Sequence, residues 1–427
     1  MAQPAQQGPG ARLWRNRNFN IFWLGQALSV LGDAFVLIAL PLLIYELTQS
    51  VLQMGLITSV AGVSMLITGL FAGVIVDRVD RRRLMIWCDI GRALIFATIP
   101  LGWWLIGPQL WLIYFVAIAG TALGMVFQVA YSSSIPNIVE PDQLTEANAR
   151  LQITYALGTA VGPFLGGYFS GRFGPAAAIG VDAVSFAISA VSLLFVTLRP
   201  VAGEQTERGR GLSFDEIVAG MRFVLTDPVL RSVAVIFFLF TLVASGGYDL
   251  FIFYLKNDLG QSDSAVGVVF GVAALGGVLG GLLVPMLRRR FGFGVCFIVG
   301  MLIECTAIAL IGLAATVPLI AVLAAFMAFS NTVKLIVSMS LRQEITPAHL
   351  LGRVTSAFWI LIRVPRPIGA AVTTAIGAEL GAPAVLVMMG VLGVLIALFG
   401  LLTPARVHSP EARTENSAKI VSSQGGA

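Results

Sequence analysis

Charged side chains are scarce in this sequence. Of its 427 residues only 11% are Asp, Glu, Lys or Arg, whereas 57% are hydrophobic and the mean hydropathy is +0.89. A soluble domain carries roughly 25% charged residues, so this chain has too few to cover a folded core with a wetted surface. The pI near 9.4 does not predict a nucleic-acid partner, because the arginines stand in short loops between apolar blocks.

Cysteine, histidine and lysine are also rare. The three cysteines lie inside apolar blocks without C-x-x-C spacing, which predicts neither a disulfide framework nor a zinc site. With only two histidines, no metal site is expected. No lysine follows the Gly-rich pattern of a phosphate-binding loop, so we expect no ATP hydrolysis, no cofactor and no enzyme. A gradient would have to drive any transport.

What the sequence has in abundance is long apolar blocks. Each block is close to the roughly 20 residues that a membrane helix needs, and apolar residues surround it without the polar stripe of a soluble helix. Inside lipid the backbone must satisfy its own hydrogen bonds, so the blocks are predicted to be helices. Twelve spans are expected, at 19–47, 52–76, 84–106, 109–133, 143–171, 175–198, 229–257, 264–287, 292–314, 316–340, 350–378 and 381–403.

The spans fall into two groups of six. Weak similarity recurs between the halves at an offset of about 212 residues, as in Gly55 to Asp77 and Gly267 to Arg290. A duplicated unit places a binding cavity at the midplane of the membrane. The predicted domains are an N-terminal bundle, a linker with an amphipathic helix along the membrane surface, a C-terminal bundle and a disordered tail, at 1–198, 199–228, 229–403 and 404–427.

Basic residues predict the orientation in the membrane. Of the 27 Lys and Arg residues, 21 fall on the side of the N-terminus, 2 on the opposite side and 4 within spans. Cytoplasmic loops are rich in Lys and Arg. We therefore expect a multi-pass protein of a bacterial inner membrane with both termini in the cytoplasm.

The loop after the second span carries a motif. It reads from Gly73 through Asp77 and Arg78 to Arg81 and Arg82, and it resembles the signature loop of the major facilitator superfamily. Within that superfamily it is most similar to the macrolide-efflux and siderophore-exporter branch. The resemblance implies a gate, in which Asp77 accepts hydrogen bonds at a facing helix N-terminus and pairs with Arg81 or Arg82. A loop that only fixes topology is the alternative.

A second motif lies in the fifth span. Its glycines and proline resemble the second half of the antiporter motif of the same superfamily, and they would let helices pack closely and bend. Generic glycine packing is the alternative to an exchange function. The motif residues are Gly158, Gly162, Pro163, Gly166 and Gly167.

Charged residues inside spans need a reason, because each costs roughly 2.5–3.5 kcal/mol at mid-bilayer. Asp33 lies at the middle of the first span and is the first candidate for a proton-binding carboxylate; Glu304 is the second. Lys334, Arg363 and Arg366 are predicted to bind an anionic group of the substrate. Prolines interleave the two arginines and should break that helix. The alternative is a structural ion pair between the halves.

Two further observations concern charge within the spans. Asp89 and Arg92 stand three residues apart near one helix end and are predicted to pair with each other in support of the Asp77 loop. Asp182 and Asp249 are left without a role.

These observations predict an all-α membrane protein with the twelve-helix major facilitator fold, in two pseudo-symmetric bundles. The expected function is proton-coupled efflux of an amphipathic organic compound by alternating access. The substrate is expected to resemble a drug, a macrolide or a siderophore, and the protein is expected to be an antiporter that acts in multidrug efflux and antibiotic resistance. The bilayer and protons are the other expected partners. Alternatives are a lysophospholipid transporter, a nutrient uptake symporter and a membrane sensor.

Overall fold

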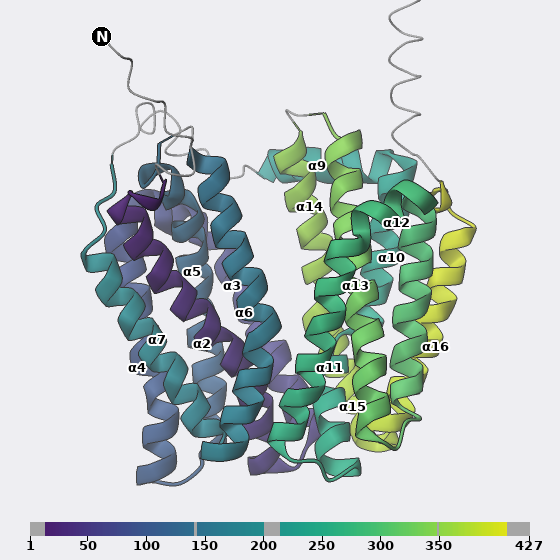
Figure 1. The fold of residues 1–427 in the computed structure, drawn as a ribbon, viewed down its shortest axis with the longest axis horizontal. Helices are drawn as coiled ribbons and strands as arrows, with labels where there is room; N and C mark the ends of the chain where they lie inside the picture. The colour runs from purple at the N-terminus through teal and green to yellow at the C-terminus, as the bar shows by residue number, and fades with distance from the viewer. Residues whose placement is uncertain (1–12, 141–142, 200–213, 348–349, 408–427) are drawn as a thin grey trace, which may run out of the picture. The chain divides into compact units, whose positions relative to one another are not determined.

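The computed structural model describes residues 13–140, 143–199, 214–347 and 350–407. The side chains of Asp77, of residue 145 and of residues 214–217 lie outside this description. Helices dominate throughout (Figure 1). In chain order the main helices are α2 (Arg17–Thr48), α3 (Val51–Arg78), α4 (Arg81–Leu105), α5 (Leu110–Ser134), α6 (Leu144–Phe173), α7 (Pro175–Leu194), α9 (Phe214–Thr226), α10 (Pro228–Ala244), α11 (Gly247–Phe253), α12 (Asp263–Ile311), α13 (Val317–Ile345), α14 (Leu351–Arg363), α15 (Pro365–Leu380) and α16 (Ala382–Leu401).

These helices account for the twelve predicted spans. Helices α10 and α11, followed by a π-helix at Tyr254–Asp258, form one span, and α14 with α15 forms another. Helix α12 holds two spans, separated at Gly292, where φ is 72°. Glycine tolerates this left-handed backbone, so the chain reverses there almost without a loop. Each predicted span end lies within about five residues of a helix end or this break.

Nine of the described helices or helix groups are long and apolar enough to cross a membrane by length and composition. Helix α12 counts once among the nine although it holds two spans. Helices α6 and α14–α15 do not pass that test. Helix α6 carries the glycines and proline of the antiporter-like motif, and α14–α15 carries Arg363 and Arg366.

The chain divides into two compact units. Unit 1 comprises Met1–Gln49, Val60–Gly211 and Ser262–Gly267. Unit 2 comprises Ser50–Ser59, Leu212–Gln261 and Val268–Ala427. Helix α3 therefore begins in unit 2 and continues in unit 1, whereas α12 begins in unit 1 and continues in unit 2.

Within unit 1, α7 packs against both α2 and α4. Helix α2 also packs against α6, and α4 against α5. These are the contacts that bring charged residues from α2, α4 and α7 together. In Figure 1 the same helices run side by side along their lengths.

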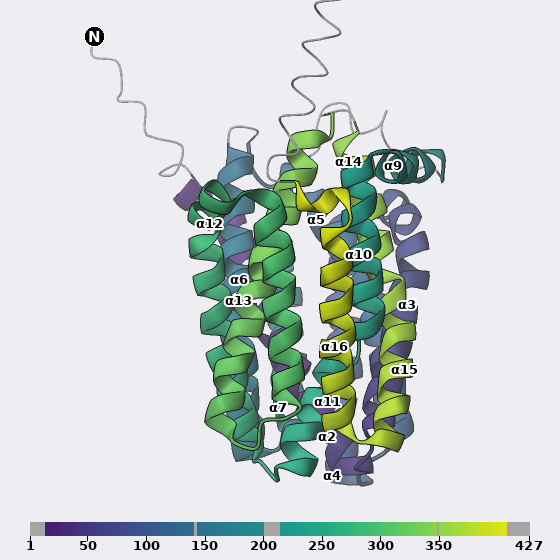
Figure 2. The same ribbon diagram turned by 90° about the vertical axis from the view of Figure 1, so that its right-hand side faces the viewer.

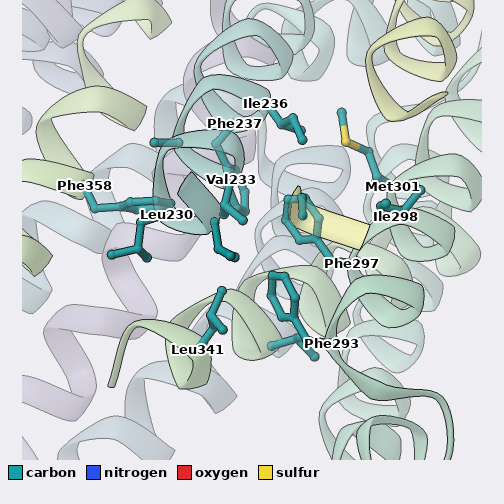
Figure 3. Close-up of a cluster of buried hydrophobic side chains, with 14 of the residues drawn as sticks. Leu230, Val233, Ile236, Phe237, Phe293, Phe297, Ile298, Met301, Leu341 and Phe358 are labelled. Carbon is teal, nitrogen blue, oxygen red and sulfur yellow. The ribbon is translucent and has the colours of Figure 1, made fainter. Parts of the chain in front are cut away.

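Unit 2 has an aromatic core. Helix α10 lies beside α15 and α16 (Figure 2). Figure 3 shows side chains from α10, α12, α13 and α14 meeting in one cluster, which includes Phe237, Phe297, Leu341 and Phe358. Phe237 contacts both neighbouring rings, with centroids 5.5 Å from Phe297 and 5.7 Å from Phe358. Burial of these apolar side chains stabilises the packing of α10 against its neighbours, in the half of α10 that is predicted to lie near the cytoplasm.

The central segment contains the predicted amphipathic helix. Helix α9 lies across the ends of α10 and α14 (Figures 1 and 2). Met221 and Val224 pack against the core of unit 2, whereas Leu225 is 47% exposed. Residues 408–427 of the predicted tail lie outside the described residues.

Candidate functional site

Asp33 forms an ion pair with Arg92. The guanidinium Nη2 donates to Oδ1 of Asp33 at 2.5 Å, joining the middle of α2 to the middle of α4. The Arg92 side chain is 10% exposed and that of Asp33 is 48% exposed. The same guanidinium lies 3.7 Å from the ring centroid of Phe186 on α7. One exposed carboxylate is therefore held by a nearly buried cation.

This pair corrects one prediction. Arg92 was expected to pair with Asp89, three residues earlier on the same helix, but the ion pair that it forms is with Asp33. The physical reason is that α7 packs against both α2 and α4, and the Arg92 guanidinium lies over the Phe186 ring of α7 while it reaches Asp33 on α2.

Two more carboxylates lie around Arg92. Asp89 and Asp182 are each 0% exposed. Oδ1 of Asp182 accepts a hydrogen bond from the Ser185 hydroxyl at 3.0 Å, while its Oδ2 has no partner. The Ser189 hydroxyl lies beside Asp89, but neither carboxylate oxygen of Asp89 makes a well-formed hydrogen bond. Three acidic side chains thus share one cation.

The antiporter-like motif supports this site. Gly158, Gly162 and Gly166 face α2, where added β-carbons would meet Val30, Ala34 and Phe35 respectively. A β-carbon on Gly166, for example, would lie 2.9 Å from the Cα of Phe35. The three glycines therefore let α6 approach α2 closely at residues that precede and follow Asp33. Pro163 is buried inside α6, and Gly167 faces Gly267 at the start of α12.

Unit 2 contains a cavity of about 430 Å³. Binding sites for small molecules usually measure about 300–1,000 Å³ and combine apolar walls with a few polar groups. This cavity fits that description, because aromatic rings and aliphatic side chains form most of its wall. The aromatic residues are Phe237, Phe240, Tyr248, Phe251 and Phe270.

A buried ion pair forms part of the cavity wall. Nζ of Lys334 on α13 donates to Oε2 of Glu304 on α12 at 2.6 Å, and the two side chains are 2% and 7% exposed. Nζ also lies 3.9 Å from the centroid of the Phe240 ring, within reach of a cation–π interaction. Residues that were assigned separate roles, proton coupling and substrate binding, are therefore joined.

The two predicted arginines have different surroundings. Arg366 lines the cavity. Arg363 does not, and its guanidinium lies 5.2 Å from the ring centroid of Trp359. The helix divides between them as the prolines predict, with α14 ending at Arg363 and α15 beginning at Pro365, although Val364 keeps helical dihedral angles.

A break in the seventh span shapes the same cavity. Helix α10 ends at Ala244, and Gly246 has a φ of 81° before α11 begins. The break places Ser245 and Gly247 in the cavity wall together with Tyr248. The Tyr248 hydroxyl is buried and makes no hydrogen bond. Interrupted helices line substrate sites in many transporters.

The signature loop has a structural role that the motif did not predict. Asp80 caps α4 by accepting a hydrogen bond from the backbone N–H of Arg83 at 2.8 Å. Arg81 donates to the carbonyl of Ser133 at 3.0 Å. Arg82 donates to the carbonyl of Leu193 at 2.8 Å. Both arginines thus bind helix C-termini, where cations are favoured.

The other residues of that loop give less information. Arg78 is exposed, and no atom lies within 4 Å of a β-carbon added to Gly73. The side chain of Asp77 lies outside the described residues. The gate therefore stays a prediction.

Comparison with known proteins agrees with this architecture. The sequence profile of the Major Facilitator Superfamily matches residues 22–361 and 245–424. The chain belongs to the major facilitator superfamily. It is thus a multi-pass membrane transporter, and the predicted all-α fold is confirmed.

Among curated members of the superfamily, the chain is similar to the enterobactin exporter EntS. It is 25% identical over 366 residues to the protein of Escherichia coli O1:K1 / APEC, covering 84% of this chain and 85% of that protein. The protein of Shigella boydii serotype 18 gives the same values. This result agrees with the predicted exporter branch.

Solved structures of the superfamily share the fold at low sequence identity. A bacterial homologue of the human lysosomal transporter Spinster gives a TM-score of 0.73 at 16% identity, covering 93% of this chain and 98% of that one. The nucleoside transporter NupG gives 0.70 at 12% identity, covering 90% and 98%.

Sequence reasoning missed several residues of these sites. Asp182 and the partner of Arg92 were not recognised, although spans one, three and six each carry a charge near mid-depth. The Ser245–Gly246–Gly247 run could have predicted the break in the seventh span. Five of the 27 phenylalanines lie in the seventh span, but their number does not show which of them face a cavity.

Proposed function

We propose that this transporter exports an amphipathic organic compound, anionic and of siderophore or drug type, in exchange for protons. The observation that carries the substrate class is the cavity of unit 2, where aromatic walls surround Lys334 and Arg366. Aromatic rings would cover the apolar part of such a ligand, and the two cations would attract its acidic groups. Similarity to enterobactin exporters supports this choice.

The cavity has a built-in competitor for an anionic ligand. Glu304 forms an ion pair with Lys334. A bound anion would have to replace Glu304, or approach Lys334 while Glu304 carries a proton. Either route links substrate binding to the charge of this carboxylate.

Proton coupling rests on Asp33. Its side chain is 48% exposed although it lies in the middle of a membrane span, and we propose that a proton enters here. When Asp33 binds a proton, its attraction to Arg92 is lost. A change in the protonation of Asp33 can therefore alter the position of Arg92 on α4.

The first experiment is a binding screen with purified protein. Iron-free siderophores, macrolides and lysophospholipids are tested for thermal stabilisation. Binding of a siderophore or macrolide that is lost in Lys334→Gln, but kept in the control Lys256→Gln outside the cavity, supports the proposal. Binding of lysophospholipid alone would favour the lipid-transport alternative.

The second experiment tests coupling. The ligand found in the screen is loaded into proteoliposomes with a pH gradient across the membrane. Asp33→Asn should retain ligand exchange at equal pH but lose accumulation driven by the gradient. If wild-type transport ignores the pH gradient, proton coupling is refuted.

A further inference from the structure

The charges around Arg92 do not balance. Asp33, Asp89 and Asp182 come from α2, α4 and α7, and one guanidinium serves all three. Two of these carboxyl groups are completely buried. A buried ionised carboxylate without a partner is strongly disfavoured. With Arg92 engaged by Asp33, the two inner carboxyls lack a counter-charge.

The part of the chain that the structure describes places no second cation beside the cluster. Within the described residues, the charged or titratable groups that face the cluster are the four already named and Cys88 on α4. Helix α5, which packs against α4, presents Gly124 to the guanidinium. Helix α6 presents glycines to α2. The remaining polar neighbours are hydroxyl and amide groups on α2 and α7, namely Gln26, Ser185 and Ser189.

The geometry leaves unused hydrogen-bonding capacity at the centre. Oδ2 of Asp182, both oxygens of Asp89 and Nε of Arg92 make no well-formed hydrogen bond. A β-carbon on Gly32 would collide with Oδ1 of Asp182, so Asp182 lies directly beside the residue that precedes Asp33. The inner carboxyls are thus close neighbours of the Asp33–Arg92 pair.

We propose that Asp89 and Asp182 form an internal proton site that exchanges with Asp33 through movement of the Arg92 guanidinium. In the first arrangement of the proposal, Arg92 pairs with ionised Asp33, the contact that the structure contains, and both inner groups are neutral acids. In the alternative arrangement an inner acid has lost its proton, Asp33 has gained one, and Arg92 pairs with the inner carboxylate. The number of protons and the net charge are the same in both.

This inference rests on the proposed proton coupling and extends it. Asp33 is the exposed entry point, and the inner carboxyls are the store that keeps Arg92 paired whichever group is ionised. The guanidinium follows the negative charge, so protonation of Asp33 is converted into a shift of Arg92 between α2 and its inner partners. A purely structural acid cluster would show no such exchange.

Infrared spectroscopy of the purified, full-length protein tests the proposal without a substrate. The carbonyl stretch of a protonated carboxylic acid is resolved from that of a carboxylate. At neutral pH the wild-type spectrum should contain this band, and Asp89→Asn and Asp182→Asn should each remove the amplitude of one acid. Asp258→Asn, which changes an exposed acid in unit 2, should remove none.

Asp33→Asn provides the decisive measurement. This variant mimics protonated Asp33, so Arg92 should turn inward and one inner acid should ionise. The protonated band should therefore fall by one carboxyl relative to wild type, although neither inner residue has been changed. Arg92→Gln combined with Asp33→Asn should restore the band, because no cation then favours ionisation.

Two results would overturn the proposal. One is a wild-type spectrum in which neither inner substitution reduces the protonated band. The other is an Asp33→Asn spectrum identical to wild type. Because Asp33 is half-exposed, this variant tests the switch even if the inner substitutions prevent folding. Failure of gradient-driven transport would refute the proposed function and leave these spectra unaffected.

Discussion

Removing one partner of the Glu304–Lys334 pair should destabilise the protein more than removing both. The two side chains are 7% and 2% exposed and their charged atoms lie 2.6 Å apart. Deleting one partner of a buried pair leaves an uncompensated charge and costs about 3–5 kcal/mol. Replacing both by apolar residues of similar volume is often neutral. The variants are Glu304→Met, Lys334→Met and the double substitution.

The assay is thermal unfolding of purified protein in one detergent, compared as a double-mutant cycle. Lys334→Met should be the worse single variant, since it also removes the cation from the Phe240 ring, 3.9 Å away. The double variant should recover most of the loss of either single variant.

The partly exposed pair Arg288–Glu344 provides a matched control. Its side chains are 19% and 38% exposed, and exposed pairs contribute about 0–1 kcal/mol. Single substitutions there should change stability little, and their effects should add. If losses at Glu304 and Lys334 also simply add, the two residues are not energetically coupled and the ion pair does not hold the cavity wall.

Three further predictions follow from the motifs. Single cysteines are introduced at positions 80 and 262 in a cysteine-free background and treated with an impermeant reagent on whole cells. The cysteine at position 80 should be protected and the one at position 262 should be labelled. The reverse pattern would invert the predicted topology. Asp77→Asn should insert into the membrane normally but transport poorly, because a coupling loss of about 1–3 kcal/mol shifts conformational populations roughly 5–150-fold. If this variant transports at the wild-type rate, the loop serves only to fix the topology. Gly162→Leu should impair transport and stability, because even a β-carbon there would collide with Ala34, whereas Gly73→Ala has open space and should be tolerated.

The extent of the helices was predictable because lipid imposes a simple rule on composition. Apolar blocks of about 20 residues must be helices, and the predicted span ends agree closely with α2 to α16. The break at Pro365 was predictable too, because proline lacks the backbone N–H that a continuous helix needs.

Pairings between helices were not predictable in the same way. Whether Arg92 reaches Asp89 or Asp33 depends on how α2, α4 and α7 are rotated about their axes, and the apolar blocks carry no strong stripe that fixes this rotation. The same holds for Glu304 and Lys334, which lie on different spans. Depth in the membrane could be read from the sequence, whereas partners required the packed structure.

The sharing of α3 and α12 between the two units has a consequence for how the protein can be divided. The first turns of α3 pack in unit 2, where Gly55 meets Thr374, and the first turn of α12 packs in unit 1, where Gly267 meets Gly167. A polypeptide cut within the central segment would therefore give two fragments. Each fragment would carry the first turns of a helix that pack against residues of the other fragment. Such half-proteins should accumulate in cells only when they are synthesised together.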